Sequence, residues 1–146
     1  MKLSTRSRYG LIAIIDLAVE YGNGPIPLSK LAQSQGVSEA YLEQLLRALK
    51  NNGIIDASRG ISGGYLLKIP PEKISAGDII YILEGHTTLV DCVSTDKNAG
   101  CERACMCAAR PLFLNLQNKI DDVLNHTMIS DLTKDYIEQK KRLEKK

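Results

Sequence analysis

The sequence predicts a mainly α-helical protein that carries one small β-hairpin. Apolar residues recur at helical spacing over most of the 146 residues. Two short β-rich runs follow one another along the chain, separated by a glycine-rich loop. Tryptophan is absent and aromatic residues make up 5% of the chain, so Leu, Ile, Val and Ala must form most of the core. A chain of this length can bury one sizeable core.

A first helix is expected to be capped by Ser4 or Thr5 and to run to about Tyr21. A glycine-rich turn at residues 22–25 ends it. The apolar positions that recur at helical spacing are Tyr9, Ile12, Ile15 and Val19. This spacing predicts that the chain opens with a helix of several turns.

A second and a third helix follow at close distance along the chain. Ser29 is expected to cap the short second helix, which Gly36 ends. Ser38 is expected to cap the third helix, with Glu39 in its first turn, where the helix dipole favours an acid, and Gly53 just after its end. The expected buried stripe of the third helix is Leu42, Leu45, Leu46 and Leu49. Two helices joined by a tight turn form a helix-turn-helix pattern.

The two β-rich runs, residues 54–58 and 64–69, come directly after this pattern. The loop between them contains Arg59 and Gly60, and its glycines allow the backbone to approach another surface closely. Helix, turn, helix and hairpin is the order of a winged helix-turn-helix domain, which we expect to span residues 1–70.

Three further segments are expected after the winged domain. Ser75 begins a connecting helix within residues 71–87, a cysteine-rich loop spans 88–107, and helices with a basic tail occupy 108–146. The long helix after the loop has an apolar stripe formed by Leu112, Phe113, Leu116, Ile120, Val123 and Leu124. Too little of the chain remains to cover this stripe, so we expect a long dimerisation helix that pairs with a second copy.

The charge and hydropathy of the chain narrow the class of protein. Residues 1–69 hold eight Lys and Arg against five acids, a net charge of +3, whereas the remainder carries −1. A mild basic excess in the N-terminal half is compatible with a polyanionic partner. No apolar run reaches the eighteen or so residues of a membrane span, and no export signal is visible, so a reducing cytoplasm is expected. Neither a nucleophile–base pair nor a phosphate loop is visible, which disfavours an enzyme.

The winged domain predicts contacts with double-stranded DNA. The candidate contact residues are Arg6, Arg8, Ser38, Tyr41, Glu43, Gln44, Arg47, Arg59 and Gly60. The third helix would enter the major groove, and Glu43 would accept from cytosine amino groups. Arg59 would enter a narrow minor groove, where negative potential is concentrated. Alternatively, Glu43 and Arg47 are a surface ion pair, and the other arginines are ordinary solvated charges.

All four cysteines, Cys92, Cys101, Cys105 and Cys107, lie within sixteen residues. Disulfides are disfavoured in a reducing compartment. The intervals of eight, three and one residues fit poorly with the paired knuckles of structural zinc. An iron–sulfur cluster tolerates irregular spacing, and plain thiol sensing remains a further alternative. His86 and His126 are at no ligand spacing and are expected at the surface.

Three segments of the sequence resemble the IscR/CymR/NsrR family of winged-helix transcriptional regulators. They are MKLSTRSRYGLIAIIDLA, VSEAYLEQLLRALKNNGIIDASRGISGGYLL and ISAGDIIYILEG, and the YLEQL and SRGxxGGY motifs are the most specific. The resemblance implies a homodimer on pseudo-palindromic DNA, with the long helix as the interface. By position, the family's DNA contacts fall on Ser38, Tyr41, Glu43, Gln44 and Arg59.

The resemblance also implies ligands for a [2Fe–2S] or [4Fe–4S] cluster. Cys101 and Cys107 reproduce the spacing of the family's last two cysteine ligands, and Cys92 supplies the first. Arg110 stands where some relatives place a ligating histidine and cannot ligate, so Cys105 is the candidate fourth ligand, or else a spare thiol. The sequence thus predicts a repressor that senses iron–sulfur or redox status. A cluster-free regulator of cysteine metabolism, acting through a partner protein or thiol oxidation, is the alternative; an electron carrier is a more distant one.

Overall fold

The computed structural model describes residues 2–85, 88–94 and 100–146. His86 and part of the expected cysteine loop, residues 95–99, lie outside the described residues. The α-helices are α1 (Thr5–Val19), α2 (Leu28–Gln35), α3 (Glu39–Asn51), α4 (Ala76–Glu84), α5 (Arg110–His126) and α6 (Ile129–Glu144). The strands are β1 (Ile55–Ser58) and β2 (Gly64–Leu67), and three short 3-10 helices are η1 (Pro71–Lys73), η2 (Asp91–Val93) and η3 (Ala104–Met106).

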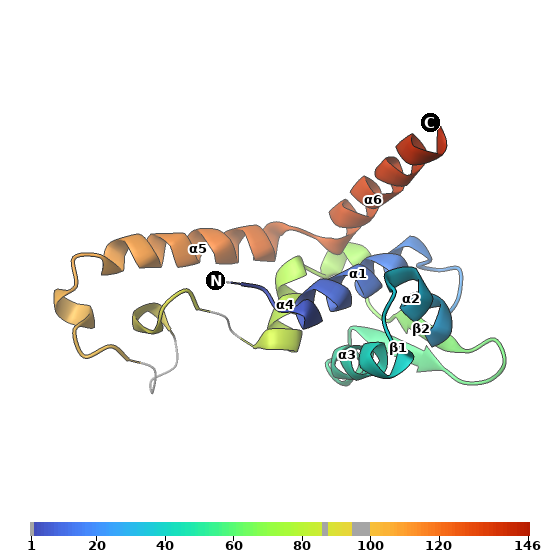
Figure 1. Cartoon of the computed structure of the whole chain (residues 1–146), viewed down its shortest axis with the longest axis horizontal. Coiled ribbons are helices and arrows are strands. Elements are labelled where there is room, and N and C mark those ends of the chain that lie inside the picture. Colours follow the sequence, from blue (N-terminus) through green and yellow to red (C-terminus); the bar gives the residue numbers. More distant parts are fainter. Residues whose placement is uncertain (1, 86–87, 95–99) are drawn as a thin grey trace.

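The expected fold class, mainly α with one hairpin, is confirmed. Helices α1 to α4 and the hairpin form one body, α6 leaves that body from its place beside α1, and α5 extends to one side (Figure 1). The hairpin loop and the cysteine-bearing segment lie at opposite ends of the long axis of the chain (Figure 1). No described helix is long and apolar enough to cross a membrane.

Three helices begin at serine caps, as the sequence predicts. The Ser4 hydroxyl accepts the Ser7 amide at 3.5 Å, and the Ser38 hydroxyl accepts the Tyr41 amide at 3.2 Å. At the start of α4, Ser75 and Asp78 cap each other's amides at 3.1 and 2.8 Å. Each serine satisfies a backbone amide that has no partner inside the helix.

The expected start of the second helix is wrong. Pro27, not Ser29, is the residue before α2, and the Pro27 carbonyl accepts the amides of Lys30 and Leu31. Proline fits this position because its fixed φ suits a helix start and its missing amide is not needed there. Ser29 lies one residue inside the helix and is exposed, so its hydroxyl caps nothing.

The buried face of α1 also differs from the expected apolar stripe. Ile12 is 41% exposed, whereas Gly10, Ala13, Ile14, Leu17 and Ala18 are buried. Small residues form much of this face because α1 is packed by α4, α6, α3 and β2 at once. A β-carbon at Gly10 would collide with the Leu83 side chain of α4, so the two helices lie unusually close. Packing from several sides overrides simple periodicity here.

The rest of the winged unit confirms the sequence pattern. Leu42, Leu45, Leu46 and Leu49 of α3 are all buried at 1% exposure or less. Gly53 follows α3 with φ +74°. Strands β1 and β2 pair antiparallel, from Ile55 opposite Leu67 to Ser58 opposite Gly64.

Two backbone clasps fix the position of the hairpin and of α6. Ile26, in the linker between α1 and α2, exchanges backbone hydrogen bonds of 2.8 and 2.9 Å with Tyr65 of β2. The carbonyl of Thr127, just after α5, accepts the Ala76 amide at 2.8 Å, and the amide of Ile129, the first residue of α6, donates to the Ile74 carbonyl at 2.8 Å. The first clasp anchors the wing to the body, and the second joins the start of α4 to the start of α6.

Candidate nucleic-acid interface and cysteine loop

Helix α3 presents a polar outer face because its leucine stripe points into the core. Ser38, Gln44 and Arg47 are exposed, and Glu43 is partly exposed. The N-terminal turn adds free backbone amides to this face, which favour an anionic partner. The arrangement is that of a helix available to a nucleic-acid groove.

Glu43 and Arg47 form a surface ion pair, with 3.8 Å between their nearest carboxylate oxygen and guanidinium nitrogen. The surface ion pair that the sequence offered as an alternative to DNA contact therefore forms in the free protein. The two side chains are 47% and 68% exposed, so the pair contributes little to stability. Arg47 can therefore exchange this partner for a base or a phosphate at low cost, and Glu43 can exchange it for a base amino group.

Tyr41 and Tyr9 connect the first turns of α3 and α1. Their rings meet edge to face at 6.1 Å between centroids and an interplanar angle of 89°. The Arg8 guanidinium lies 5.7 Å from the centre of the Tyr9 ring, and both Arg6 and Arg8 are exposed. The contact brings the basic first part of α1 beside the start of α3.

The hairpin loop carries Arg59 and Gly60 into solvent. Both are exposed, and Ile61 is 107% exposed, which is full exposure. Gly60 has φ +106°, and its carbonyl accepts the Gly63 amide at 3.0 Å, closing a tight turn. A β-carbon at Gly63 would collide with the Ser58 carbonyl oxygen, so the turn requires glycine there.

Tyr65 connects the wing with the outer face of α3. Burial raises the pKa of its phenol, the charge of Glu43 raises the pKa further, and Arg47 opposes this effect. The hydroxyl therefore stays protonated and able to donate at neutral pH. Helix α3 also contacts strand β1, so the base of the wing adjoins the helix.

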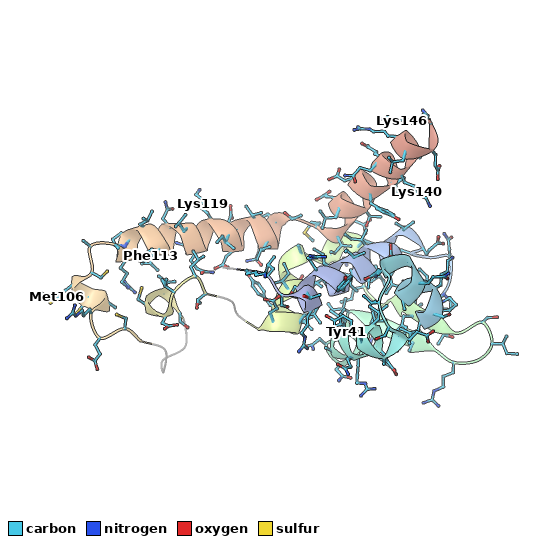
Figure 2. All side chains as sticks on the ribbon, viewed as in Figure 1. Tyr41, Met106, Phe113, Lys119, Lys140 and Lys146 are labelled. Carbon is cyan, nitrogen blue, oxygen red and sulfur yellow. The ribbon has the colours of Figure 1, made fainter. Side chains whose placement is uncertain are left out.

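The four thiols are free and differ in exposure. Cys92 in η2 and Cys107 just before α5 are partly buried, whereas Cys101 and Cys105 are exposed. Figure 2 shows Met106, between two of these cysteines, at the outer end of the segment, away from Tyr41. Within the described ranges, no three Cys, His, Asp or Glu side chains are close enough to hold a metal ion.

Arg110 ties the first and last cysteines together. Its Nε donates to the Cys92 carbonyl at 3.2 Å, and its backbone amide donates to the Cys107 carbonyl at 3.2 Å. The sequence identified Arg110 only as a residue that cannot ligate. No pattern in the chain predicts this bond, because it joins residues eighteen positions apart through a backbone acceptor.

The sequence analysis also did not identify a buried glutamine on α5, Gln117, as a residue that supports the site. Gln117 is 7% exposed; it accepts the Leu89 amide at 2.9 Å and donates to Asp121 at 3.0 Å. The Tyr81 hydroxyl of α4 donates to the same Asp121 oxygen at 3.1 Å. These bonds connect the cysteine-bearing segment to α5 and α4. The one feature of the sequence that could have indicated this role is that Gln117 is a polar residue directly after Leu116, within the segment that carries the apolar stripe.

The apolar face of α5 is open in the single chain. Leu112, Leu116 and Val123 are 57%, 44% and 64% exposed. A shallow groove of about 310 Å³ runs along this face, lined by Leu116, Lys119, Ile120, Val123 and Leu124. Exposed aliphatic side chains in a contiguous row are typical of a protein–protein contact.

The helix-turn-helix, the clasped wing and the polar outer face of α3 together define the winged-helix class of transcriptional regulators. The chain belongs to the Rrf2 family, described as "Iron-dependent Transcriptional regulator", which it matches over residues 3–135.

Known members of the family are similar to this chain over most of their length. It is 39% identical to the transcriptional regulator CymR of Bacillus subtilis over 90% of this chain and 89% of that protein. It is 33% identical to the regulator IscR of Erwinia tasmaniensis over 90% of this chain and 78% of that protein. The solved structure of B. subtilis CymR, called its global cysteine regulator, superposes with a TM-score of 0.78 over 92% of this chain and 97% of that chain.

Proposed function

We propose that this protein is a homodimeric repressor that binds a pseudo-palindromic operator and responds to iron–sulfur or redox status. The observation that carries the DNA-binding part is the exposed polar outer face of α3, which lies beside strand β1 at the base of the wing. Helix α3 would lie in the major groove and the wing tip in the minor groove. Family membership supports transcriptional regulation.

Each candidate DNA contact would have a distinct role. Arg6, Arg8 and Ser38 would bind phosphates and fix the register of the protein on the duplex. The base edges would be faced by Glu43, Gln44 and Arg47. The Glu43 carboxylate would accept a hydrogen bond from a cytosine amino group, whereas phosphates repel it. Tyr41 would donate to phosphate while its ring keeps α3 against α1. Arg59 would enter the minor groove, and Gly60 would allow the wing backbone to approach the sugar–phosphate chain.

The exposed face of α5 supports the dimer. Leu112, Leu116 and Val123 have no cover within the described chain, and a second copy of α5 offers the same apolar row. A two-fold pair would cover both rows with one self-complementary contact. Two winged heads related by a two-fold axis match a palindromic operator.

The donor set fits an iron–sulfur cluster held by Cys92, Cys101 and Cys107, with Cys105 as the fourth ligand. All four donors are thiols, the ligands that such clusters prefer. Arg110 is the first residue of α5, and its side chain holds the Cys92 backbone there. The positive charge of Arg110 and the N-terminal end of the helix dipole both favour the thiolate form of a nearby cysteine. When bound, the cluster would supply a centre sensitive to iron supply and to oxidants.

The hydrogen bonds around Gln117 give the cysteine segment a physical connection to the DNA-binding body. The Leu89 backbone is held by Gln117, and Asp121 then joins Gln117 to Tyr81 of α4. Leu83 of α4 lies in tight contact with α1. A change in the cysteine segment would thus alter the placement of the winged head on α5, and through it the fit of two heads to an operator.

Anaerobic purification tests the cluster. We expect stoichiometric iron and sulfide with visible absorption, and loss of both in Cys92→Ala, Cys101→Ala and Cys107→Ala. Cys105→Ala is expected to lower the cluster content if that thiol is the fourth ligand. Normal content in the first three variants would remove the cluster from the proposal and leave the DNA-binding part intact.

Operator titration tests the wing. Arg59→Ala should weaken operator binding by roughly 1–3 kcal/mol, measured at several salt concentrations. Lys141→Ala, an exposed lysine on α6, is the matched control and should bind as the unaltered protein does. Equal affinities for the Arg59 variant and the control would argue against insertion of the wing.

A cluster-free regulator of cysteine metabolism is the second candidate. The exposed thiols of Cys101 and Cys105 favour it, since they are accessible to oxidants, and so does the 39% identity to CymR. In this case the oxygen-free protein would lack iron and sulfide. Its operator affinity would instead change on thiol oxidation or on addition of a partner protein.

A further inference from the structure

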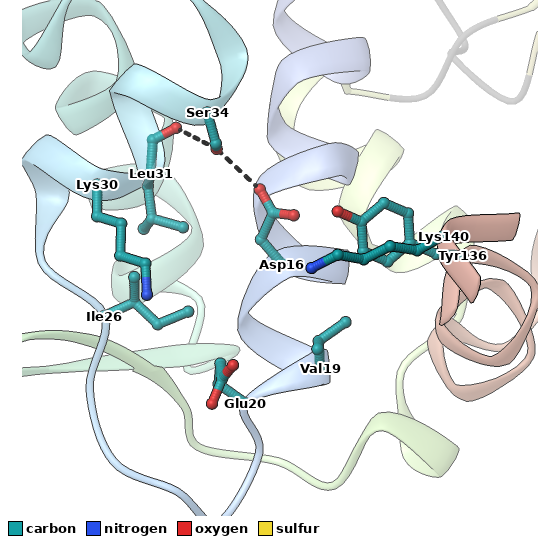
Figure 3. A pocket seen from close by; sticks show the side chains of 9 residues that line it. All are labelled: Asp16, Val19, Glu20, Ile26, Lys30, Leu31, Ser34, Tyr136 and Lys140. Carbon is teal, nitrogen blue, oxygen red and sulfur yellow. Dashed lines mark hydrogen bonds between the residues drawn. The ribbon is translucent and has the colours of Figure 1, made fainter. Parts of the chain in front are cut away.

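Helices α1, α2 and α6 meet at a hollow on the surface of the molecule (Figure 3). Its volume is about 230 Å³. The lining residues come from α1, the α1–α2 linker, α2 and α6, and they are Asp16, Val19, Glu20, Ile26, Lys30, Leu31, Ser34, Tyr136 and Lys140. None of them belongs to the candidate DNA contacts or to the cysteine segment.

Each helix contributes a pair of polar side chains one turn apart. Asp16 comes from α1 and Glu20 from the residue that caps its C-terminal end, Lys30 and Ser34 come from α2, and Tyr136 and Lys140 come from α6. Residues four apart lie on one face of a helix, so each pair points to the same side. The hollow therefore holds two carboxylates and two ammonium groups above an apolar floor.

The charges in the hollow do not satisfy one another. In the part of the chain that the structure describes, Lys30, Lys140 and Asp16 form no ion pair within 4.0 Å. Asp16 lies at a long hydrogen-bond distance of 3.4 Å from the neutral Ser34 hydroxyl, which the Leu31 carbonyl shares at 2.9 Å. Burial raises the pKa of Asp16, and hydrogen bonding offsets part of that effect. A half-buried carboxylate that forms no described ion pair is suited to an incoming positive group.

We infer that this hollow binds a small zwitterion of the size and charge of an α-amino acid. Asp16, assisted by Glu20, would receive the ammonium group, and Lys140 would receive the carboxylate; Figure 3 shows its ammonium end directed toward the hollow beside Asp16. Val19 and Leu31 would contact a short apolar side chain. Drug-sized ligands occupy about 300–1,000 Å³, so the smaller volume here suits a metabolite.

The bound zwitterion would join α6 to α2, the first helix of the helix-turn-helix. Helix α6 follows α5, whose apolar face we assign to the dimer. A ligand between α6 and α2 would fix the winged head relative to the dimer helix without any contact with the cysteines. The inference thus concerns a second input to the regulator and does not depend on the cluster.

A thermal-shift and NMR screen of the cluster-free full-length chain tests the inference. The probes are the L-amino acids with small side chains, each at millimolar concentration, and two analogues of each: the amine without a carboxylate and the N-acetylated acid. At one hundred times its Kd, a true ligand should raise the melting temperature by about 5–10 °C. Both analogues should lose at least tenfold in affinity, because each lacks one charge.

Two variants separate a ligand site from a surface groove. Lys140→Met nearly keeps the length of the side chain and removes its charge, so the affinity for the amino-acid ligand should fall at least tenfold. Lys141→Met removes the neighbouring charge, which does not line the hollow, and should bind as the unaltered protein does. The inference is overturned if no probe raises the melting temperature, or if the two variants respond alike. Either result would leave the DNA and cluster experiments unaffected.

Discussion

Arg110→Ala should expose the Cys92 thiol to chemical modification. The wild-type side chain holds the Cys92 carbonyl at 3.2 Å in a partly buried setting. A hydrogen bond from a charged donor contributes about 1.5–3 kcal/mol. Because Cys92 is partly buried, its thiol reacts mainly when η2 separates from α5. Loss of the bond should therefore raise the reactive population, and the alkylation rate of Cys92, by roughly tenfold to one hundredfold.

The rate is measured by iodoacetamide labelling of the reduced, cluster-free protein, followed by peptide mass spectrometry. Cys105 is an internal reference, since it is exposed in the wild type and should react equally fast in all variants. Arg103→Ala is the matched control, because Arg103 is an exposed arginine of the same segment whose side chain makes no described bond. Equal Cys92 rates in the Arg110 and Arg103 variants would refute the reasoning.

Three further changes test the packing and electrostatics of the chain. Leu116→Asp should convert the proposed dimer to a monomer in sedimentation velocity, whereas Asn118→Asp, also exposed on α5, should not; a persistent dimer would exclude this face. Gly10→Val should lower the free energy of unfolding by about 1–3 kcal/mol in denaturant titrations, since the added carbons meet Leu83. Asp16→Asn should stabilise the protein at pH 7 but not below the unfolded pKa of 3.8, because burial raises the folded pKa and penalises only the charged form.

Local signals in the sequence predicted most of the secondary structure. The serine caps of α1, α3 and α4 and the leucine stripe of α3 depend on residues within one or two turns, so the sequence reveals them. The start of α2 was wrong because Pro27 and Ser29 are both acceptable near a helix start, and local preference did not rank them. The prediction for the buried face of α1 was wrong because five elements, α2, α3, α4, α6 and β2, pack on this helix.

The candidate sites were predictable only in part. Motifs along the chain named the DNA contacts and the cysteines, and these assignments stay predictions. Arg110 and Gln117 act on residues far away in the sequence, through a backbone carbonyl and a backbone amide that any residue type provides. The hollow between α1, α2 and α6 escaped detection because its charges come from three separate helices. Such features depend on tertiary contacts and leave no periodic trace.

The clasp between Ile26 and Tyr65 is made entirely by main-chain atoms. The hydrogen bonds themselves require no particular side chain, but Ile26 is also buried in the core and Gly64 leaves room for the Ile26 carbonyl, so packing and backbone bonds hold the wing together. Residues 59–62 at the tip of the wing are exposed and take no part in this clasp. The two hydrogen bonds thus hold the hairpin stem on the body and leave the tip residues, Arg59 among them, in solvent where a partner can reach them.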